Sequence, residues 1–339
     1  MKTVILSVRA DLSEAIKAAV NLLMLNSIAA IPTETVYGLA GNALEPEAIA
    51  KIFEAKERPY FDPLIVHIAC YEWLSKLVRR GSAEIPLVRK LMERFWPGPL
   101  TILFSKTNLV PDIVTGGSQY VAIRMPNHPV FHEVLRQFGK PLAAPSANRF
   151  GRLSPTRPEH VFEELSGRIP LILDAGPTAV GLESTVVRVV ESRVEILRPG
   201  PITEELLGEL APAKELHDFE KITAPGQTTS HYAPGKRVYL LENHDPLGHT
   251  EDSALLCWGP IHDLQKFAVV RSLSEKCDLL EAAQRLFELL REMDQKENLK
   301  RIFVETVPEE GLGRAIMNRI RRAAAPRRAE PSNDRPGIR

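Results

Sequence analysis

The chain has 339 residues, of which 44% are hydrophobic and 25% charged, and its 43 Lys and Arg balance its 43 Asp and Glu. This length favours two domains, and the neutral balance argues against a general attraction to nucleic acid or anionic membranes. Only 3 cysteines occur, which excludes a disulfide framework and fits a reducing compartment. No apolar run approaches the ~18 residues of a membrane span, and the N-terminus is unlike a signal segment, so we expect a cytoplasmic protein without membrane contact.

The first 210 residues alternate helical and strand-like patterns. Apolar residues recur at helical spacing in 12–23 and 45–57, and "PLIVHI", "LTILF", "YVAIRMP" and "LILDAG" are compact β-rich runs. Residues 184–200, "STVVRVVESRVEILRPG", predict a hairpin with "ESR" at its tip. Because hairpin and crossover connections both occur, the pattern predicts an α/β domain with a mixed sheet.

Periodicity stops between residues 211 and 236, where Pro, Gly, Thr and Lys are frequent and a linker is expected. Strand-like runs then alternate with helical patterns over 237–325. This order predicts a smaller, Rossmann-like α/β domain with a largely parallel sheet. Residues 326–339 are polar and rich in proline, which predicts a flexible tail.

Several cations stand near the ends of predicted elements. Lys56 and Arg58 follow a helix, and in an extended segment side chains two residues apart point the same way, so both can face one anion. A solvated helix end explains the same pair. Arg124 lies inside an apolar strand and needs a partner, such as a ligand carboxylate or phosphate, unless the strand is an exposed edge. Arg198, at the end of another strand, likewise needs a partner such as a ligand anion.

Polar side chains also follow predicted strands. Ser146 and Asn148 come after a strand, where open α/β sheets bind ligands, although an ordinary turn explains them equally well. His67 at the end of "PLIVH" is by itself more typical of a satisfied strand-end histidine than of a catalyst. P-loop, GxGxxG, HExxH and GxSxG motifs are absent, and the acids of "PTETVYG", "ILDAG" and "GLEST" form no recognisable metal triad. Together, these cations and hydroxyls suit the binding of a polyanion and a small zwitterion better than they suit a hydrolytic active site.

In chain order, these segments resemble the threonylcarbamoyl-AMP synthases, in the long form with a second domain. The matching segments are "IPTETVYGLA", "KIFEAKERP", "PLIVHI", "WPGPLTILF", "VAIRMPNHP", "PLAAPSAN", "LDAGPT", "GLESTVV", "ILRPGPIT", "SHYAPGK" and "GLGRAIMNRIRRAA". The resemblance runs from about residue 10 to 325. It implies a YrdC-like catalytic domain over 1–210 with a twisted mixed sheet, a linker over 211–236 and a C-terminal α/β domain over 237–325.

The resemblance also implies a reaction. L-Threonine, bicarbonate and ATP give L-threonylcarbamoyladenylate and pyrophosphate, which makes the enzyme a nucleotidyltransferase of tRNA modification. A separate transferase would then use the product to modify the adenosine beside the anticodon. Mg²⁺ is implied with ATP, bound through the phosphates, and no covalent nucleophile is implied. The implied L-threonine site is Thr35, His67, Arg124 and Ser184, and the implied ATP site is Lys56, Arg58, Asp62, Ser146, Asn148, Ser154, Arg198 and Tyr232.

These residue types suit that reaction. A carbamate formed on the threonine amine attacks the α-phosphate, which requires positioning and charge neutralisation. Lys56 and Arg58 would gather triphosphate oxygens, and Arg124 would hold the threonine carboxylate. The threonine methyl is worth only ~1–3 kcal/mol, so rejection of serine should be incomplete. Tyr120 departs from the small hydroxyl residue often found at its position in the family, and Ser118 and Thr115 are the candidates to replace that ATP contact.

Two other functions are compatible with parts of the sequence. A double-stranded RNA-binding protein would expose Arg314, Arg321 and Arg322 on one helix, although the same helix can pack through its apolar face. The neutral charge and the lack of an aromatic platform disfavour RNA as the main ligand, so direct tRNA binding is not expected. A carbamoyltransferase like the related domain of hydrogenase maturation proteins would need zinc-finger cysteines and additional modules.

The linker carries a further prediction. Turn-forming Pro225, Gly226 and Pro234 flank "SHY", which is typical of a shaped loop rather than a free tether. We therefore expect Tyr232, with Ser230 and His231 nearby, to close over the nucleotide and exclude water from the acyl-adenylate. The sequence leaves open whether the second domain is a stability or dimer module or a gate.

Overall fold

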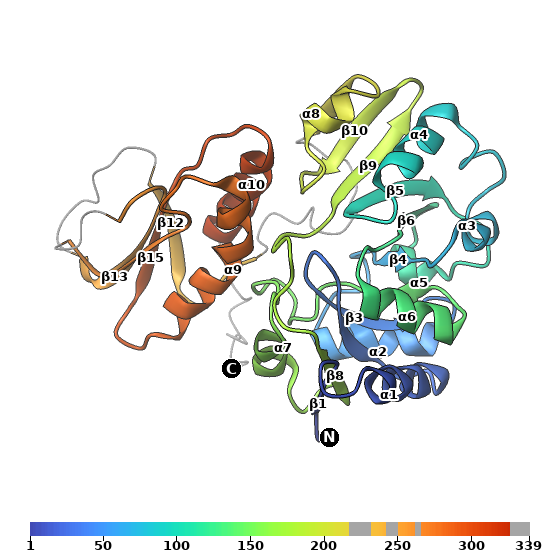
Figure 1. Ribbon diagram of the computed structural model, residues 1–339, viewed down its shortest axis with the longest axis horizontal. Coiled ribbons are helices and arrows are strands. Elements are labelled where there is room, and N and C mark those ends of the chain that lie inside the picture. The colour runs from blue at the N-terminus through green and yellow to red at the C-terminus, as the bar shows by residue number, and fades with distance from the viewer. Residues whose placement is uncertain (217–231, 242–249, 262–265, 326–339) are drawn as a thin grey trace, which may run out of the picture.

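The computed structural model describes residues 1–216, 232–241, 250–261 and 266–325 (Figure 1). These residues form an eleven-stranded sheet and a separate four-stranded sheet, each with helices packed against it. Within the described ranges, no helix is both long and apolar enough to cross a membrane. Ser230, His231 and the expected tail over 326–339 lie outside the described residues.

The larger sheet is mixed, as expected. Its strand order is β1-β8-β2-β3-β7-β4-β6-β5-β9-β10-β11. The sheet contains parallel pairs, such as β4 with β6, and antiparallel pairs, such as β5 with β6. Its strands are β1 (Val4–Ser7), β2 (Ala29–Pro32), β3 (Tyr37–Asn42), β4 (Ile65–His67), β5 (Leu100–Ser105), β6 (Tyr120–Arg124), β7 (Leu142–Ala143), β8 (Leu171–Asp174), β9 (Thr185–Val190), β10 (Arg193–Arg198) and β11 (Ala213–Glu215).

Helices bury both faces of this sheet. Successive side chains of β2 point to opposite faces of the sheet. Ala30 accordingly belongs to one apolar cluster, while Ala29 and Ile31 belong to another. Helices α1 and α6 contribute to the second cluster and pack against each other, whereas α2 and α4 contribute to the first. The helices are α1 (Leu12–Met24), α2 (Pro46–Lys56), α3 (Tyr71–Leu77), α4 (Pro86–Phe95), α5 (Asp112–Thr115), α6 (Pro129–Phe138), α7 (Pro158–Leu165) and α8 (Glu204–Gly208).

The predicted hairpin is confirmed, and the predicted linker begins later than expected. β9 and β10 pair antiparallel, and Glu191 in the turn between them has a left-handed φ of 55°. β11 pairs parallel with β10, so residues 213–215 form an edge strand of the first sheet. The composition of this stretch conceals the strand because an edge strand has one partner and little buried surface.

The second sheet is parallel throughout its described strands, as predicted. It has the order β12-β15-β13-β14, with β12 (Arg237–Leu241), β13 (Thr250–Cys257), β14 (Phe267–Ser272) and β15 (Arg301–Glu305). Helices α9 (Leu279–Gln295) and α10 (Leu312–Ala324) pack together and lie between this sheet and the first domain (Figure 1). The helices of the second domain therefore face the first domain.

Candidate active site

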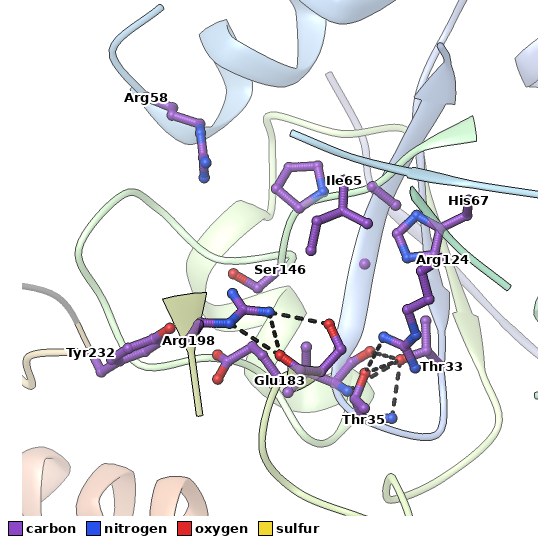
Figure 2. A pocket seen from close by; sticks show the side chains of 15 residues that line it. Thr33, Thr35, Arg58, Ile65, His67, Arg124, Ser146, Glu183, Arg198 and Tyr232 are labelled. Carbon is purple, nitrogen blue, oxygen red and sulfur yellow. Dashed lines mark hydrogen bonds between the residues drawn. The ribbon is translucent and has the colours of Figure 1, made fainter. Parts of the chain in front are cut away.

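A pocket forms where the loops after several strands of the large sheet converge (Figure 2). Thr33 and Thr35 follow β2, His67 ends β4, Arg124 ends β6 and Arg198 ends β10. Eight residues predicted for ligand binding line it, namely Thr35, Arg58, His67, Arg124, Ser146, Ser184, Arg198 and Tyr232. The chain thus brings together side chains that are far apart in sequence.

Arg124 is held at one end of the pocket by three partners. Its Nη1 donates to Thr35 Oγ1 at 2.9 Å and its Nε donates to the Gly98 carbonyl at 3.1 Å. Its Nη2 pairs with Glu34 Oε1 at 2.5 Å, and both side chains are largely buried. The partner that a buried strand arginine requires is therefore supplied by the protein itself, through an acid that sequence reasoning left unassigned. A planar guanidinium held in this way has a fixed orientation toward the pocket.

His67 is a neutral side chain beside this arginine. It is 2% exposed and its ring lies 5.1 Å from that of Phe131. Burial, and then the charge of Arg124, lower the pKa of His67 to about 3. At neutral pH the imidazole carries no charge, so it can donate or accept a hydrogen bond but cannot neutralise a carboxylate.

Ser184 and Arg198 form the opposite wall. Arg198 Nη2 donates to the Ser184 carbonyl at 2.8 Å and to Ser184 Oγ at 3.2 Å. Ser184 Oγ also lies 2.8 Å from Thr101 Oγ1, where either hydroxyl can donate. Ser184 precedes β9 directly and Arg198 ends β10, so the hairpin positions both residues together.

Glu183 and Tyr232 border the pocket on the side of the second domain (Figure 2). Tyr232 is 1% exposed, has a left-handed φ of 59° and stacks on Phe287 of α9 with ring centroids 5.6 Å apart. A non-glycine residue in this conformation is strained and is often found at functional sites. Ser154 Oγ donates to the Glu183 carboxylate, so Ser154 supports the wall from behind and is not among the lining residues.

Lys56 and Arg58 do not lie in the extended segment that was expected. Lys56 ends α2, and Glu57 adopts a left-handed φ of 54° as its C-cap, which separates the directions of the two cations. Lys56 is 1% exposed and donates to the carbonyls of Ser146 and Asn148, each at 2.5 Å. Lys56 thus ties α2 to the loop that carries Ser146, outside the pocket lining.

Arg58 does reach the pocket, accompanied by its own acid. Its Nη2 lies 2.9 Å from Asp62 Oδ2 and 2.8 Å from the Pro63 carbonyl. Asp62 is fully buried and is not a lining residue, so its contact with the pocket is indirect, through Arg58. Asn148 likewise lies behind the lining, and its Nδ2 donates to the carbonyls of Arg149 and Arg152.

The three residues considered for an additional ATP contact near the start of β6 lie outside the pocket. Tyr120 begins β6 and is partly exposed, and its N–H donates to Ser118 Oγ at 3.1 Å. Thr115 Oγ1 donates to the Ser118 carbonyl at 2.9 Å. None of the three is a lining residue of this pocket.

Comparison with known proteins decides the family. A family model described as "Telomere recombination" matches residues 21–200, and one described as "Threonylcarbamoyl-AMP synthase, C-terminal domain" matches residues 199–325. The threonylcarbamoyl-AMP synthase of Pyrococcus abyssi is 38% identical over 337 residues, covering 95% of this chain and 98% of that protein. This chain belongs to the threonylcarbamoyl-AMP synthases. The Bacillus subtilis threonylcarbamoyl-AMP synthase is 39% identical over 335 residues, covering 92% of this chain and 93% of that one.

A solved structure also shares the two-domain fold. The crystal structure of P. abyssi Sua5 complexed with L-threonine matches with a TM-score of 0.85 at 35% identity, over 95% of this chain and 98% of that chain. The resemblance and the fold class predicted from the sequence are therefore confirmed.

The RNA-binding alternative is not favoured by these relatives or by α10. Arg314 pairs with Glu205 of α8 at 2.5 Å, and Arg321 pairs with Glu309. Ile316 and Ile320 are buried, so α10 packs through the apolar face that the sequence indicated. Two of the three arginines named for RNA binding are thus paired with acids of the same chain.

Proposed function

We propose that this chain makes L-threonylcarbamoyladenylate from L-threonine, bicarbonate and ATP, with release of pyrophosphate. The observation that supports this most directly is the pocket itself, in which three arginines stand among several hydroxyl residues. The arginines, Arg58, Arg124 and Arg198, suit phosphate and carboxylate groups, and Thr35 and Ser184 suit the threonine hydroxyl. Such a site neutralises charge and positions reactants, which is what adenylation of a carbamate requires.

The Arg124 end of the pocket is proposed to hold L-threonine. A guanidinium has five N–H donors, and the three contacts of Arg124 leave donors for a substrate carboxylate. His67, kept neutral, would contribute a hydrogen bond to the hydroxyl or amine without competing for the carboxylate. Ser184 would complete the set from the opposite wall.

The other end is proposed to hold ATP, with Arg58, Ser146, Arg198 and Tyr232 in contact and Lys56, Asp62, Asn148 and Ser154 supporting them from behind. Mg²⁺ is proposed to accompany ATP and to neutralise phosphate charge, with phosphate oxygens as its ligands. Within the described residues, no group of three His, Cys, Asp or Glu side chains is placed for a metal ion.

Tyr232 is proposed to limit the access of water to the acyl-adenylate once ATP is bound. Its burial between the pocket and Phe287 supports this role. We further propose that the protein works in the cytoplasm, and that the product passes to a separate transferase that modifies tRNA without stable tRNA binding by this chain.

Pyrophosphate release tests the proposal. With ATP, bicarbonate and Mg²⁺, the protein should release pyrophosphate only when L-threonine is added. Arg124→Lys should raise the KM for L-threonine by about 10- to 100-fold, since one charge-assisted contact is worth ~1.5–3 kcal/mol. Arg136→Lys, which alters a surface ion pair with Glu133 in α6, is the matched control and should leave KM unchanged. Threonine-independent release, or salt-sensitive RNA binding with no turnover, would overturn the assignment.

A further inference from the structure

One arginine of the second domain reaches the pocket wall of the first. Arg319 lies on α10, is fully buried, and donates from Nε to Glu183 Oε2 at 2.9 Å. Its Nη1 donates to the Pro199 carbonyl at 3.0 Å, directly after Arg198. Its guanidinium carbon also lies 5.1 Å from the centre of the Tyr232 ring. A single guanidinium therefore contacts three segments that border the pocket.

The acid that Arg319 meets is itself part of the pocket lining. Glu183 accepts from Ser154 and precedes Ser184, whose carbonyl and hydroxyl are contacted by Arg198. Burial alone would raise the pKa of Glu183, but the charges of Arg319 and then Arg198 hold it below its usual value. Glu183 therefore stays ionised, and a buried carboxylate of this kind requires its cation.

Helix α9 clamps the same segment from a second direction. Gln284 Nε2 donates to the Ala179 carbonyl at 2.7 Å. Gly181 has a φ of +82°, and a Cβ at this position would lie 2.5 Å from the Ala283 carbonyl, so only glycine permits this approach. On its other side, the N–H of Gly181 donates to the Thr35 carbonyl at 3.2 Å. Residues 179–184 are thus held between the second domain and the loop of Thr35.

We propose that Arg319 is a positioning residue through which the second domain holds the 183–184 wall and Tyr232 in the geometry that binds ATP and L-threonine. A guanidinium is required because one planar group must contact the Glu183 carboxylate, the Pro199 carbonyl and the face of the Tyr232 ring at the same time. The second domain is then an integral part of the binding site. This inference rests on the proposed function for the identity of the ligands.

The proposal predicts unequal effects from two arginines of the same helix. Arg319→Met should weaken ATP binding, measured by calorimetry, and raise the KM for L-threonine, each by at least ~10-fold. Arg319→Lys can keep an ion pair with Glu183 but not the carbonyl and ring contacts. It should therefore lower the thermal midpoint less than Arg319→Met does, while ATP affinity still falls about fivefold or more. Arg314→Met breaks another contact between α10 and the first domain, with Glu205, and should change neither constant by more than about twofold.

A double variant separates positioning from folding. Arg319→Met combined with Glu183→Gln removes both buried charges, so the fold should survive even if Arg319→Met alone does not. The double variant should still bind ATP at least ~10-fold more weakly than the wild type. The proposal is overturned if Arg319→Lys and the double variant both bind ATP within about twofold of the wild type, or if Arg314→Met causes an equal loss. If the wild type shows no threonine-dependent pyrophosphate release, the proposed function is refuted instead. The ATP calorimetry would still test the positioning role of Arg319.

Discussion

Replacing Lys56 by methionine should destabilise the first domain more than replacing an ordinary lysine at a helix end would. The ammonium donates to the Ser146 and Asn148 carbonyls from a position that is 1% exposed. In the variant, the Ser146 carbonyl would still accept a hydrogen bond from the N–H of Asn148, which lies at 3.0 Å. The Asn148 carbonyl would lose the one partner recorded for it in the described part of the chain.

The magnitude follows from these two losses. A buried acceptor left unpaired costs ~1–3 kcal/mol, and a lost hydrogen bond to a charged group costs ~1.5–3 kcal/mol. Part of this is offset, because burial and the nearby charge of Arg58 lower the pKa of Lys56 and make its ammonium costly to bury. We therefore expect Lys56→Met to lower the free energy of unfolding by ~2–4 kcal/mol.

Urea unfolding followed by circular dichroism measures this change, with Lys51→Met as the control. Lys51 lies on the same helix, and its side chain is 38% exposed, pairs with Glu47 and donates to the Asn26 carbonyl at 3.0 Å. Because water can replace both partners of this half-exposed side chain, its replacement should cost ~1 kcal/mol, less than that of Lys56. The reasoning is refuted if Lys56→Met unfolds at the same urea concentration as the wild type while ATP binding collapses. That result would place the ammonium on the phosphates instead of the loop carbonyls.

Three further predictions concern the pocket. Because the pKa of His67 is lowered to about 3, the unfolded chain binds a proton below pH 6.5 that the folded chain does not, so stability falls as pH drops toward 3. This residue should account for ~2 kcal/mol of the loss between pH 7 and 5, and denaturant titrations should show that His67→Gln removes that share. Tyr232→Ala should lower stability by ~3–5 kcal/mol and abolish synthesis, because the ring packs on Phe287; unchanged turnover in this variant would contradict a closing role. L-Serine should be used with a kcat/KM ~10–150-fold below that of L-threonine, and rejection beyond ~10⁴-fold would indicate a different recognition mode.

Much of the fold is predictable from local pattern alone. Periodicity indicated α1, α9 and α10, and the "ESR" turn indicated the β9–β10 hairpin, because each depends on contacts that are near in sequence. The order of the eleven strands is different, since it depends on pairings between segments more than 100 residues apart, such as β1 with β8. The edge strand β11 was missed because it has few apolar residues and one partner.

The site was predictable in its residue types but not in its pairings. The cations Arg124 and Arg198 were identified because an arginine at the end of an apolar strand needs a partner. Which partner it finds depends on the loops that converge on it, so Glu34 was not anticipated. Arg319 was hidden more completely, because on α10 it stands among other arginines and nothing local distinguishes a buried cation from solvated ones.

These pairings change how the charge of the pocket should be understood. Arg58 is paired with Asp62, Arg124 with Glu34 and Arg319 with Glu183, so the cations around the pocket are largely balanced by acids of the protein. A bare cluster of arginines would attract any polyanion, and its side chains would move apart by repulsion. Paired guanidiniums are instead fixed in direction, and they offer their remaining N–H groups only along those directions. Selectivity for a nucleotide beside a small amino acid then comes from geometry that is set before binding, which is why a residue as distant in sequence as Arg319 bears on substrate affinity.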